Sequence, residues 1–203
     1  EELNATLDAF DVKPTQRQYL VRGVEIYTCA RDGIVYGIVM AGRAGNVTSA
    51  AMIGSLIPLI SFKGAALVGM AAGNPSKKAQ KIGDVVVSEM VVDYEFQRLT
   101  TEGSKLMPQP YHPPHDGVFR NAEGIETHVR GWGKKVQAEL ASRSYGAHED
   151  DLSDESRQKL QLIEPTVKLG VIMAGGKLIE DGSLAGLATH ISDRVRAAEM
   201  DGA

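Results

Sequence analysis

The sequence predicts an α/β fold with a mixed, mostly parallel central sheet flanked by helices. Segments rich in apolar and β-branched residues alternate with segments of helical periodicity, which favours parallel strands joined by helices. Three strand-like segments end in glycine-bearing turns, after Met40, Met70 and Met173. Ligands of such sheets bind at the carboxyl ends of the strands, so we expect a binding site near these turns.

The first part of the chain contains two expected helices, a hairpin and a buried strand. Leu3, Leu7 and Phe10 recur at helical spacing, and two strand-like segments around the turn at 31–33 predict the hairpin. The run 65–70 is wholly apolar without alternation, as expected of a strand covered on both faces. The expected elements span 1–10 (helix), 24–29 and 34–40 (hairpin), 47–60 (helix) and 65–70 (strand), before a turn over 71–75.

The remainder contains two more expected strands and two helices around a long loop. Residues 85–92 are rich in β-branched side chains, which favours a strand. Between residues 93 and 131 the composition shifts towards proline and glycine, so we expect an active-site loop or lid. The other expected elements span 132–143 (helix), 167–173 (strand) and 184–195 (helix), with an exposed acidic stretch over 146–156.

Composition narrows the class of protein. A chain of 203 residues with 43% hydrophobic and 24% charged residues is typical of one soluble globular domain. The net charge of −4 gives no electrostatic footprint for long nucleic acid, and no apolar stretch is long enough for a membrane span. The single cysteine, Cys29, cannot form an intrachain disulfide, which favours a reducing, cytoplasmic compartment. A buried structural role suits this thiol better than a nucleophilic one.

Two glycine-rich segments are candidate binding elements. Residues 41–46 place Arg43 and two glycines between a strand and a helix, where the backbone can approach an anion. A tight turn without a ligand, with Arg43 solvated, fits the pattern equally well. Residues 69–74 are small, which leaves space for a ligand or for close packing of a helix on a strand.

The histidines and the last acidic residues give weaker indications of a metal site or a ligand-binding site. His112 and His115 are separated by two prolines and lack companion ligands, so we expect neither a metal site nor a cofactor. Glu199 and Asp201 would face the same side of a strand, with Met200 on the other. One carboxylate facing a pocket can accept two hydrogen bonds from a ribose, although two solvated acids are the alternative.

Taken in order, four segments resemble the purine nucleoside phosphorylase/uridine phosphorylase superfamily. They are Gly69–Asn74, Lys81–Ser88, Met173–Gly176 and Glu199–Asp201. Within it the chain is most similar to methylthioadenosine/S-adenosylhomocysteine nucleosidases, and to related domains attached to bacterial signalling and antiphage proteins. The resemblance implies one nucleoside phosphorylase-like domain over residues 1–203, truncated at both ends, without the family's first strand or its C-terminal strand and helix. It also implies a homo-oligomer and fusion to other signalling domains.

The resemblance implies a role for each candidate residue. Glu2 matches the glutamate that activates water, and Arg43 lies in the family loop near the nucleophile and ribose. Ala71 and Gly73 match the strand end that faces the ribose and the attacking water or phosphate, with Ala71 where a serine is common.

The purine and ribose contacts of the family fall later in the chain. Leu178 and Ile179 match the pair whose backbone holds the purine edge, with Leu178 where phenylalanine is frequent. Met200 would pack under the ribose, and Asp201 replaces the glutamate that binds the ribose hydroxyls. The family's later aspartate, which protonates the leaving purine, would lie beyond Ala203.

The expected activity is hydrolysis of the N-glycosidic bond of a purine nucleoside or nucleotide, releasing the free base. One alternative is a phosphorylase that uses phosphate as nucleophile, with Arg43 as a phosphate ligand. A second is a non-catalytic nucleotide-binding sensor or effector domain. A third is a nucleosidase acting on AMP or ATP, with phosphate contacts from Arg43, Lys77 or Lys78.

Overall fold

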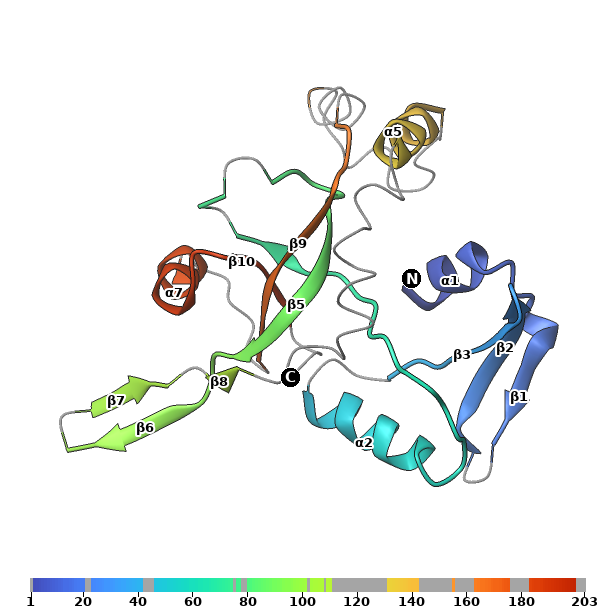
Figure 1. The fold of residues 1–203 in the computed structure, drawn as a ribbon, viewed down its shortest axis with the longest axis horizontal. Helices are drawn as coiled ribbons and strands as arrows, with labels where there is room; N and C mark the ends of the chain where they lie inside the picture. The colour runs from blue at the N-terminus through green and yellow to red at the C-terminus, as the bar shows by residue number, and fades with distance from the viewer. Residues whose placement is uncertain are drawn as a thin grey trace. The chain divides into compact units, whose positions relative to one another are not determined.

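The computed structural model describes most of the chain, and its residues form two compact units (Figure 1). The first unit runs to Met70, and the second runs from Ala71 to Glu199. The described residues are 2–20, 23–41, 46–74, 76–77, 80–101, 103–107, 109–110, 131–142, 155, 163–175 and 183–199.

The first unit contains a three-stranded antiparallel sheet and two helices. Its elements are α1 (Glu2–Ala9), the short 3-10 helix η1 (Pro14–Gln16), β1 (Arg17–Tyr19), β2 (Glu25–Arg31), β3 (Ile34–Ile38) and α2 (Asn46–Leu56). The expected hairpin is confirmed as β2 and β3, which are joined by Asp32 and Gly33 with positive φ angles of 52° and 76°. This turn geometry matches the twist of the flanking strands. Leu7, Val12 and Tyr27 form the small buried core.

The prediction of a strand over residues 65–70 is wrong. This segment has no regular structure, and Leu67, Val68 and Met70 are 55%, 71% and 76% exposed. No described strand pairs with this segment. The expected helix over 47–60 is confirmed but ends at Leu56, because the residue before Pro58 is disfavoured in the helical conformation.

The second unit is built on a five-stranded mixed sheet with the strand order β4-β10-β9-β5-β8. The strands are β4 (Ala72–Gly73), β5 (Val85–Asp93), β8 (Gln109–Pro110), β9 (Val167–Ala174) and β10 (Val195–Glu199). The three central strands are parallel, and the short edge strands β4 and β8 are antiparallel to their neighbours. This confirms the predicted mixed, mostly parallel sheet of an α/β fold.

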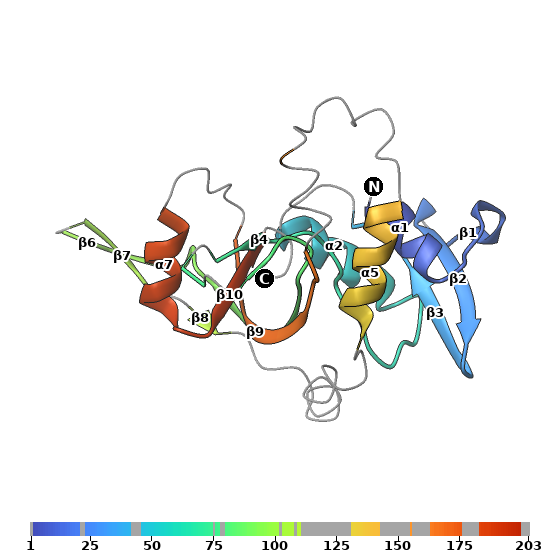
Figure 2. The same ribbon diagram turned by 90° about the horizontal axis from the view of Figure 1, so that it is seen from above.

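One helix packs on this sheet, and another contacts the segment that leads into it. Helix α7 (Ser183–Ile191) packs its buried Leu184 and Ala188 against Val92 and Met173 of the sheet, and both views show it beside β10 (Figures 1 and 2). Helix α5 (Trp132–Ser142) begins against the entry to β9, where a Cβ on Gly133 would lie 2.0 Å from the backbone oxygen of Pro165. Helix α5 therefore needs glycine at residue 133, where it contacts Pro165.

Two elements of the second unit differ from the sequence prediction. The helix expected to reach residue 195 ends at Ile191, where the Ser192 hydroxyl accepts a hydrogen bond from the Arg194 backbone N–H (3.1 Å). Such a local bond competes with helical continuation, and β10 follows. The loop expected after residue 93 begins with a hairpin, β6 (Gln97–Thr100) and β7 (Gly103–Leu106), and residues 111–130 lie outside the described residues.

Candidate active site

The parallel strands end level with one another and define one edge of the sheet. Asp93, the last residue of β5, pairs with Ala174, the last residue of β9, which in turn pairs with Glu199 at the end of β10. The Gly175 N–H donates to the Glu199 carbonyl (3.2 Å). This bond links the residue after β9 to the last residue of β10. Carboxyl ends of parallel strands are where ligands bind in such sheets, and we call this place the carboxyl edge.

Strand β4 brings two candidate residues to the carboxyl edge. Gly73 pairs with Ala197 and Ala72 pairs with Ala198, so the start of β4 lies beside the end of β10. Ala71 and Gly73 are both exposed. Among described atoms, a Cβ on Gly73 would meet only the Gln80 side chain, at 4.0 Å. Packing therefore gives no reason for glycine at this position, which leaves it open to a ligand.

Gly175, at the same edge, has the opposite character. A Cβ there would lie 2.5 Å from Cε1 of Tyr94 and 2.9 Å from Cγ of Glu95. Tyr94 is 6% exposed, and its N–H is bonded to the Ala174 carbonyl (3.3 Å). Glycine is thus required at residue 175 for the close approach of the β5 and β9 ends.

Asn74 fixes β4 on β10, a role that sequence reasoning missed. Its side chain is buried, and Nδ2 donates to the Val195 carbonyl (2.9 Å). Its Oδ1 accepts hydrogen bonds from the Ser76 N–H (3.0 Å) and hydroxyl (2.7 Å). Gln80 adds a bond from Nε2 to the Arg196 carbonyl (2.8 Å). The only signal in the sequence was a lone polar residue closing a run of small ones.

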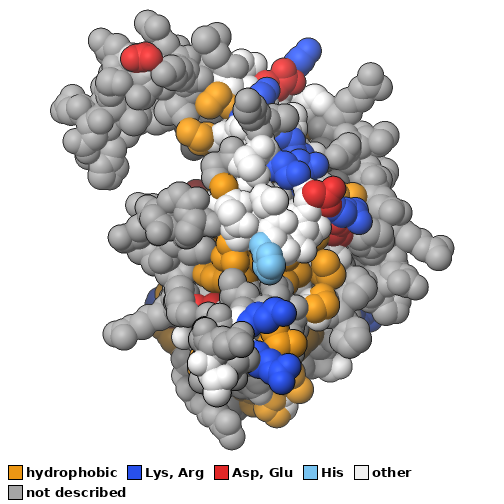
Figure 3. Space-filling model, turned by 90° about the vertical axis from the view of Figure 1, so that its left-hand side faces the viewer, with side chains coloured by type: hydrophobic (Ala, Val, Ile, Leu, Met, Phe, Trp, Pro, Cys, Tyr) orange, Lys and Arg blue, Asp and Glu red, His pale blue; other side chains and the backbone are white. Residues whose placement is uncertain are grey.

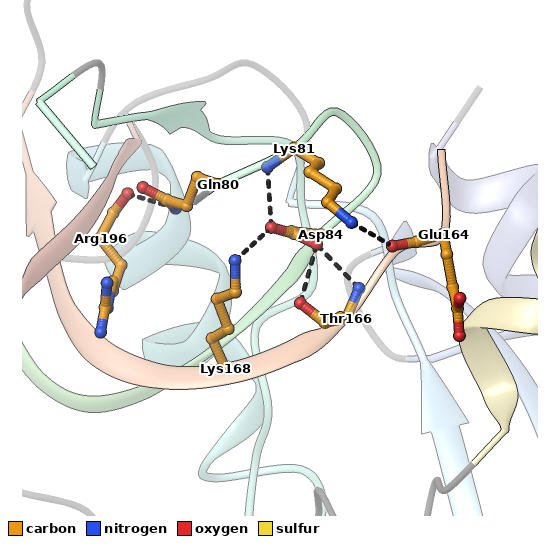
Figure 4. A network of polar contacts seen from close by, with 7 residues as sticks. All are labelled: Gln80, Lys81, Asp84, Glu164, Thr166, Lys168 and Arg196. Carbon is orange, nitrogen blue, oxygen red and sulfur yellow. Dashed lines mark hydrogen bonds and ion pairs between the residues drawn. The ribbon is translucent and has the colours of Figure 1, made fainter. Parts of the chain in front are cut away.

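The other end of the sheet is held by Asp84 (Figure 4). Its Oδ2 accepts bonds from Lys168 Nζ (2.7 Å) and the Lys81 N–H (2.8 Å). Its Oδ1 accepts bonds from the Thr166 N–H (2.7 Å) and hydroxyl (3.0 Å). Gly83 turns into this position with a φ of 84°, which favours glycine.

The charge on Asp84 is stabilised by these donors. Burial raises the pKa of the carboxyl, whose side chain is only 2% exposed. The bonds from Lys168, Lys81 and Thr166 outweigh burial and hold the pKa below its usual range. Because Asp84 ties the amino ends of β5 and β9 together, the segment Lys81–Ser88 stabilises the sheet and lies away from the carboxyl edge.

The fold of this chain is similar to that of several solved structures. No protein-family model matches the sequence, and no curated protein matches it either. Solved structures do match. A methylthioadenosine/S-adenosylhomocysteine nucleosidase from Colwellia psychrerythraea in complex with adenine is 20% identical, with a TM-score of 0.59 over 100% of this chain and 70% of that one.

Two further structures agree with it. A mutant nucleosidase of the same kind from Helicobacter pylori, with 5'-methylthioadenosine in the active site, is 15% identical, with a TM-score of 0.61 over 99% of this chain and 71% of that one. A futalosine hydrolase mutant from the same organism is 15% identical, with a TM-score of 0.57 over 99% and 74%. The chain has the nucleosidase fold. The resemblance inferred from the sequence is confirmed at the level of fold, since these neighbours are members of the nucleoside phosphorylase/nucleosidase superfamily.

The described part of the nucleosidase fold contains only some of the candidate residues. Gly73 lies on β4 beside Ala197 of β10, and Ala71 directly precedes β4 on the side of the carboxyl edge. Glu2 begins α1 in the first unit, and its side chain is not described. The remaining candidates lie outside the described residues: Arg43, Leu178, Ile179, Met200 and Asp201, and likewise Lys78, His112 and His115. Their roles stay predictions.

The strands nevertheless lead directly into two of these segments. Gly175 follows β9 and precedes the segment that carries Leu178 and Ile179, while Glu199 ends β10 immediately before Met200. Within the described residues, no group of three or more His, Cys, Asp or Glu side chains is placed to hold a metal ion. None of the described helices is long and apolar enough to cross a membrane.

Proposed function

We propose that this chain hydrolyses the N-glycosidic bond of a purine nucleoside or nucleotide and releases the free base. The observation that carries the proposal is the nucleosidase fold, which spans 99–100% of the chain in neighbours that hold adenine or 5'-methylthioadenosine. The exposed small residues of β4 at the carboxyl edge support it, because they leave room for a sugar beside the strand ends.

In the proposed reaction, water replaces the purine at the anomeric carbon of the ribose. Glu2 removes a proton from the water as general base, a contribution of about 10²–10⁴-fold in rate. The bond between the anomeric carbon and the purine nitrogen breaks through an oxocarbenium-like state. Its electron pair goes to the purine, which then takes up a proton. Asp201 accepts hydrogen bonds from the ribose hydroxyls and orients the sugar.

The remaining candidates would position the substrate. Ala71 and Gly73 would face the ribose and the attacking water, with no hydroxyl from Ala71 to bind either. The backbone of Leu178 and Ile179 would hold the purine edge, and Met200 would pack under the ribose. Arg43 would lie in the loop near the nucleophile.

Base release from purine nucleosides and nucleotides, measured with and without inorganic phosphate, tests the proposal. Phosphate-independent release is expected, with a fall of about 10²–10⁴-fold in kcat for Glu2→Gln. Asp8→Asn is the matched control, because it removes one exposed carboxylate from the same helix. Release that requires phosphate and yields ribose 1-phosphate would assign a phosphorylase. Binding without release would assign a sensor or effector domain.

The assembly and compartment also belong to the proposal. We infer a homo-oligomer of one nucleosidase-like domain over residues 1–203, working in the cytoplasm. Exposed apolar side chains in the first unit support an oligomer, since Val47 and Ile57 on and after α2 are 84% and 63% exposed. The free thiol of Cys29 fits a reducing compartment. Light scattering of the purified protein would test the assembly.

A further inference from the structure

One face of the hairpin β6–β7 combines two cations with two apolar side chains. Arg98 pairs directly with Lys105 across the hairpin. The Met107 N–H donates to the Phe96 carbonyl (2.8 Å), which continues the ladder by one step. Side chains alternate between the faces of a strand, so all four residues lie on the same face. Arg98 and Lys105 are exposed, and Phe96 and Met107 are 45% and 43% exposed.

This arrangement costs the hairpin stability. Residues directly opposite each other have Cβ atoms about 4.5–5.5 Å apart, and like charges there are destabilising. Neither Arg98 nor Lys105 forms an ion pair with another residue that the structure describes. An isolated hairpin is marginal even without such repulsion. A ligand with an anionic group and an apolar body would offset the repulsion and cover the exposed side chains.

The hairpin starts at the carboxyl edge. Phe96 is three residues beyond Asp93, where β5 ends, and Arg98 is five residues beyond it. At about 3.3 Å per residue, Arg98 lies within roughly 17 Å of that strand end. Figure 3 shows the side on which the hairpin lies in Figure 1, with Lys and Arg side chains exposed next to hydrophobic ones.

We propose that the Arg98 and Lys105 face of β6–β7 binds phosphate groups of the substrate, so that the chain acts on a phosphorylated purine nucleoside. This rests on the proposed function. The guanidinium of Arg98 can form paired, charge-assisted hydrogen bonds with a phosphate, and Lys105 adds a second positive charge. Phe96 and Met107 pack against the ribose of the bound nucleotide.

The test compares adenosine, AMP and ATP as ligands and as substrates of the purified protein. Dissociation constants come from calorimetry, and base release is followed with and without inorganic phosphate. The variant Arg98→Gln/Lys105→Gln removes both charges. Lys134→Gln/Lys135→Gln is the matched control, because it removes two exposed charges from α5 in the same unit. Arg98→Lys/Lys105→Arg keeps the charge of the face.

We expect AMP or ATP to bind at least about tenfold more tightly than adenosine, an advantage that salt weakens. The Arg98→Gln/Lys105→Gln variant should lose this advantage and bind adenosine unchanged. The control pair and the charge-preserving pair should keep it.

The phosphate site would be overturned by equal affinity for adenosine and nucleotides, by an unchanged advantage in the neutral variant, or by an equal loss in the control pair. Base release that requires free phosphate, and loses this requirement in the neutral variant, would also overturn it. Equal affinities with adenosine hydrolysis intact would leave the proposed function standing. An advantage that the neutral variant loses, with no base released from any substrate, would support the phosphate site and refute the proposed function. Failure to bind any of the three ligands would overturn both.

Discussion

Gly73 and Gly175 lie at the same edge of the sheet, yet alanine at each should have opposite consequences. In Gly175→Ala the new methyl group would overlap the Tyr94 ring at 2.5 Å and 2.6 Å. The ring is buried and its backbone N–H is bonded to Ala174, so it cannot swing away at low cost. Overpacking of this kind costs about 1–3 kcal/mol, or more where the backbone must shift. At about 2–4 °C per kcal/mol for a chain of this size, we expect Tm to fall by about 2–12 °C.

Gly73→Ala should leave the fold intact. Gly73 is not among the described glycines with positive φ, and the nearest described atom to a new Cβ is 4.0 Å away. Replacing glycine by alanine at a compatible position stabilises by about 0.4–1 kcal/mol. If the sugar lies against Gly73, however, the methyl group displaces it. A misplacement of about 1 Å can cost about 10²-fold in rate, so kcat/KM should fall by about 10- to 100-fold.

Thermal unfolding followed by circular dichroism, together with base-release kinetics, measures both effects on one set of proteins. Gly186→Ala is the control, because Gly186 is exposed on α7 with open space around its Cβ position. It should keep full activity and gain up to about 1 kcal/mol. A Gly175→Ala protein as stable as the parent would refute the packing argument. A fully active Gly73→Ala protein would show that no ligand approaches β4.

The polar contacts give three more expectations. Asp84→Asn should lower the free energy of unfolding by about 2 kcal/mol at pH 7, measured by urea denaturation, because it breaks a partly buried ion pair with Lys168. Since the folded pKa of Asp84 is lowered, its contribution is complete above the ordinary aspartate pKa of about 3.9 and is lost as the pH falls through the folded value. The difference in stability between parent and Asp84→Asn should therefore shrink as the pH falls below about 4, and a constant difference would contradict this. Asn74→Ala should cost about 2 kcal/mol by leaving the buried Val195 carbonyl without its donor, and it should raise KM more than Ser76→Ala does, because β4 loses its anchor on β10.

The elements that the sequence predicted correctly are those in which one local rule dominates. The β-branched run at 85–92 became β5, and the Asp32-Gly33 turn fixed the hairpin through its positive φ angles. The errors concern segments whose state depends on distant partners. Residues 65–70 have the composition of a buried strand, but no described strand pairs with them. The helix expected to reach residue 195 ends at Ile191, and β10 begins at Val195 because β9 and β4 supply ladders on both sides.

In the candidate site, too, the sequence did not reveal contacts between residues that are far apart in the chain. The small residues of β4 were recognisable because a run without side-chain bulk indicates space, but Asn74 was not, since its partner Val195 is 121 positions away. The hairpin cations were equally hidden. Only the register shows that Arg98 and Lys105 stand opposite each other, and residue spacing alone does not fix a register.

The two ends of the parallel sheet have different tasks, and the residue types follow from them. At the amino ends, Asp84 gathers four donors and fixes β5 to β9 with polar contacts. At the carboxyl ends, close backbone approach at Gly175 holds β5 and β9 together, while the Asn74 side chain fixes β4 to Val195 at the start of β10. Ala71, just before β4, and Gly73 are exposed, and the nearest described atom to a Cβ on Gly73 is 4.0 Å away. Substitutions at the amino ends should report on folding, whereas substitutions on β4 should report on the ligand.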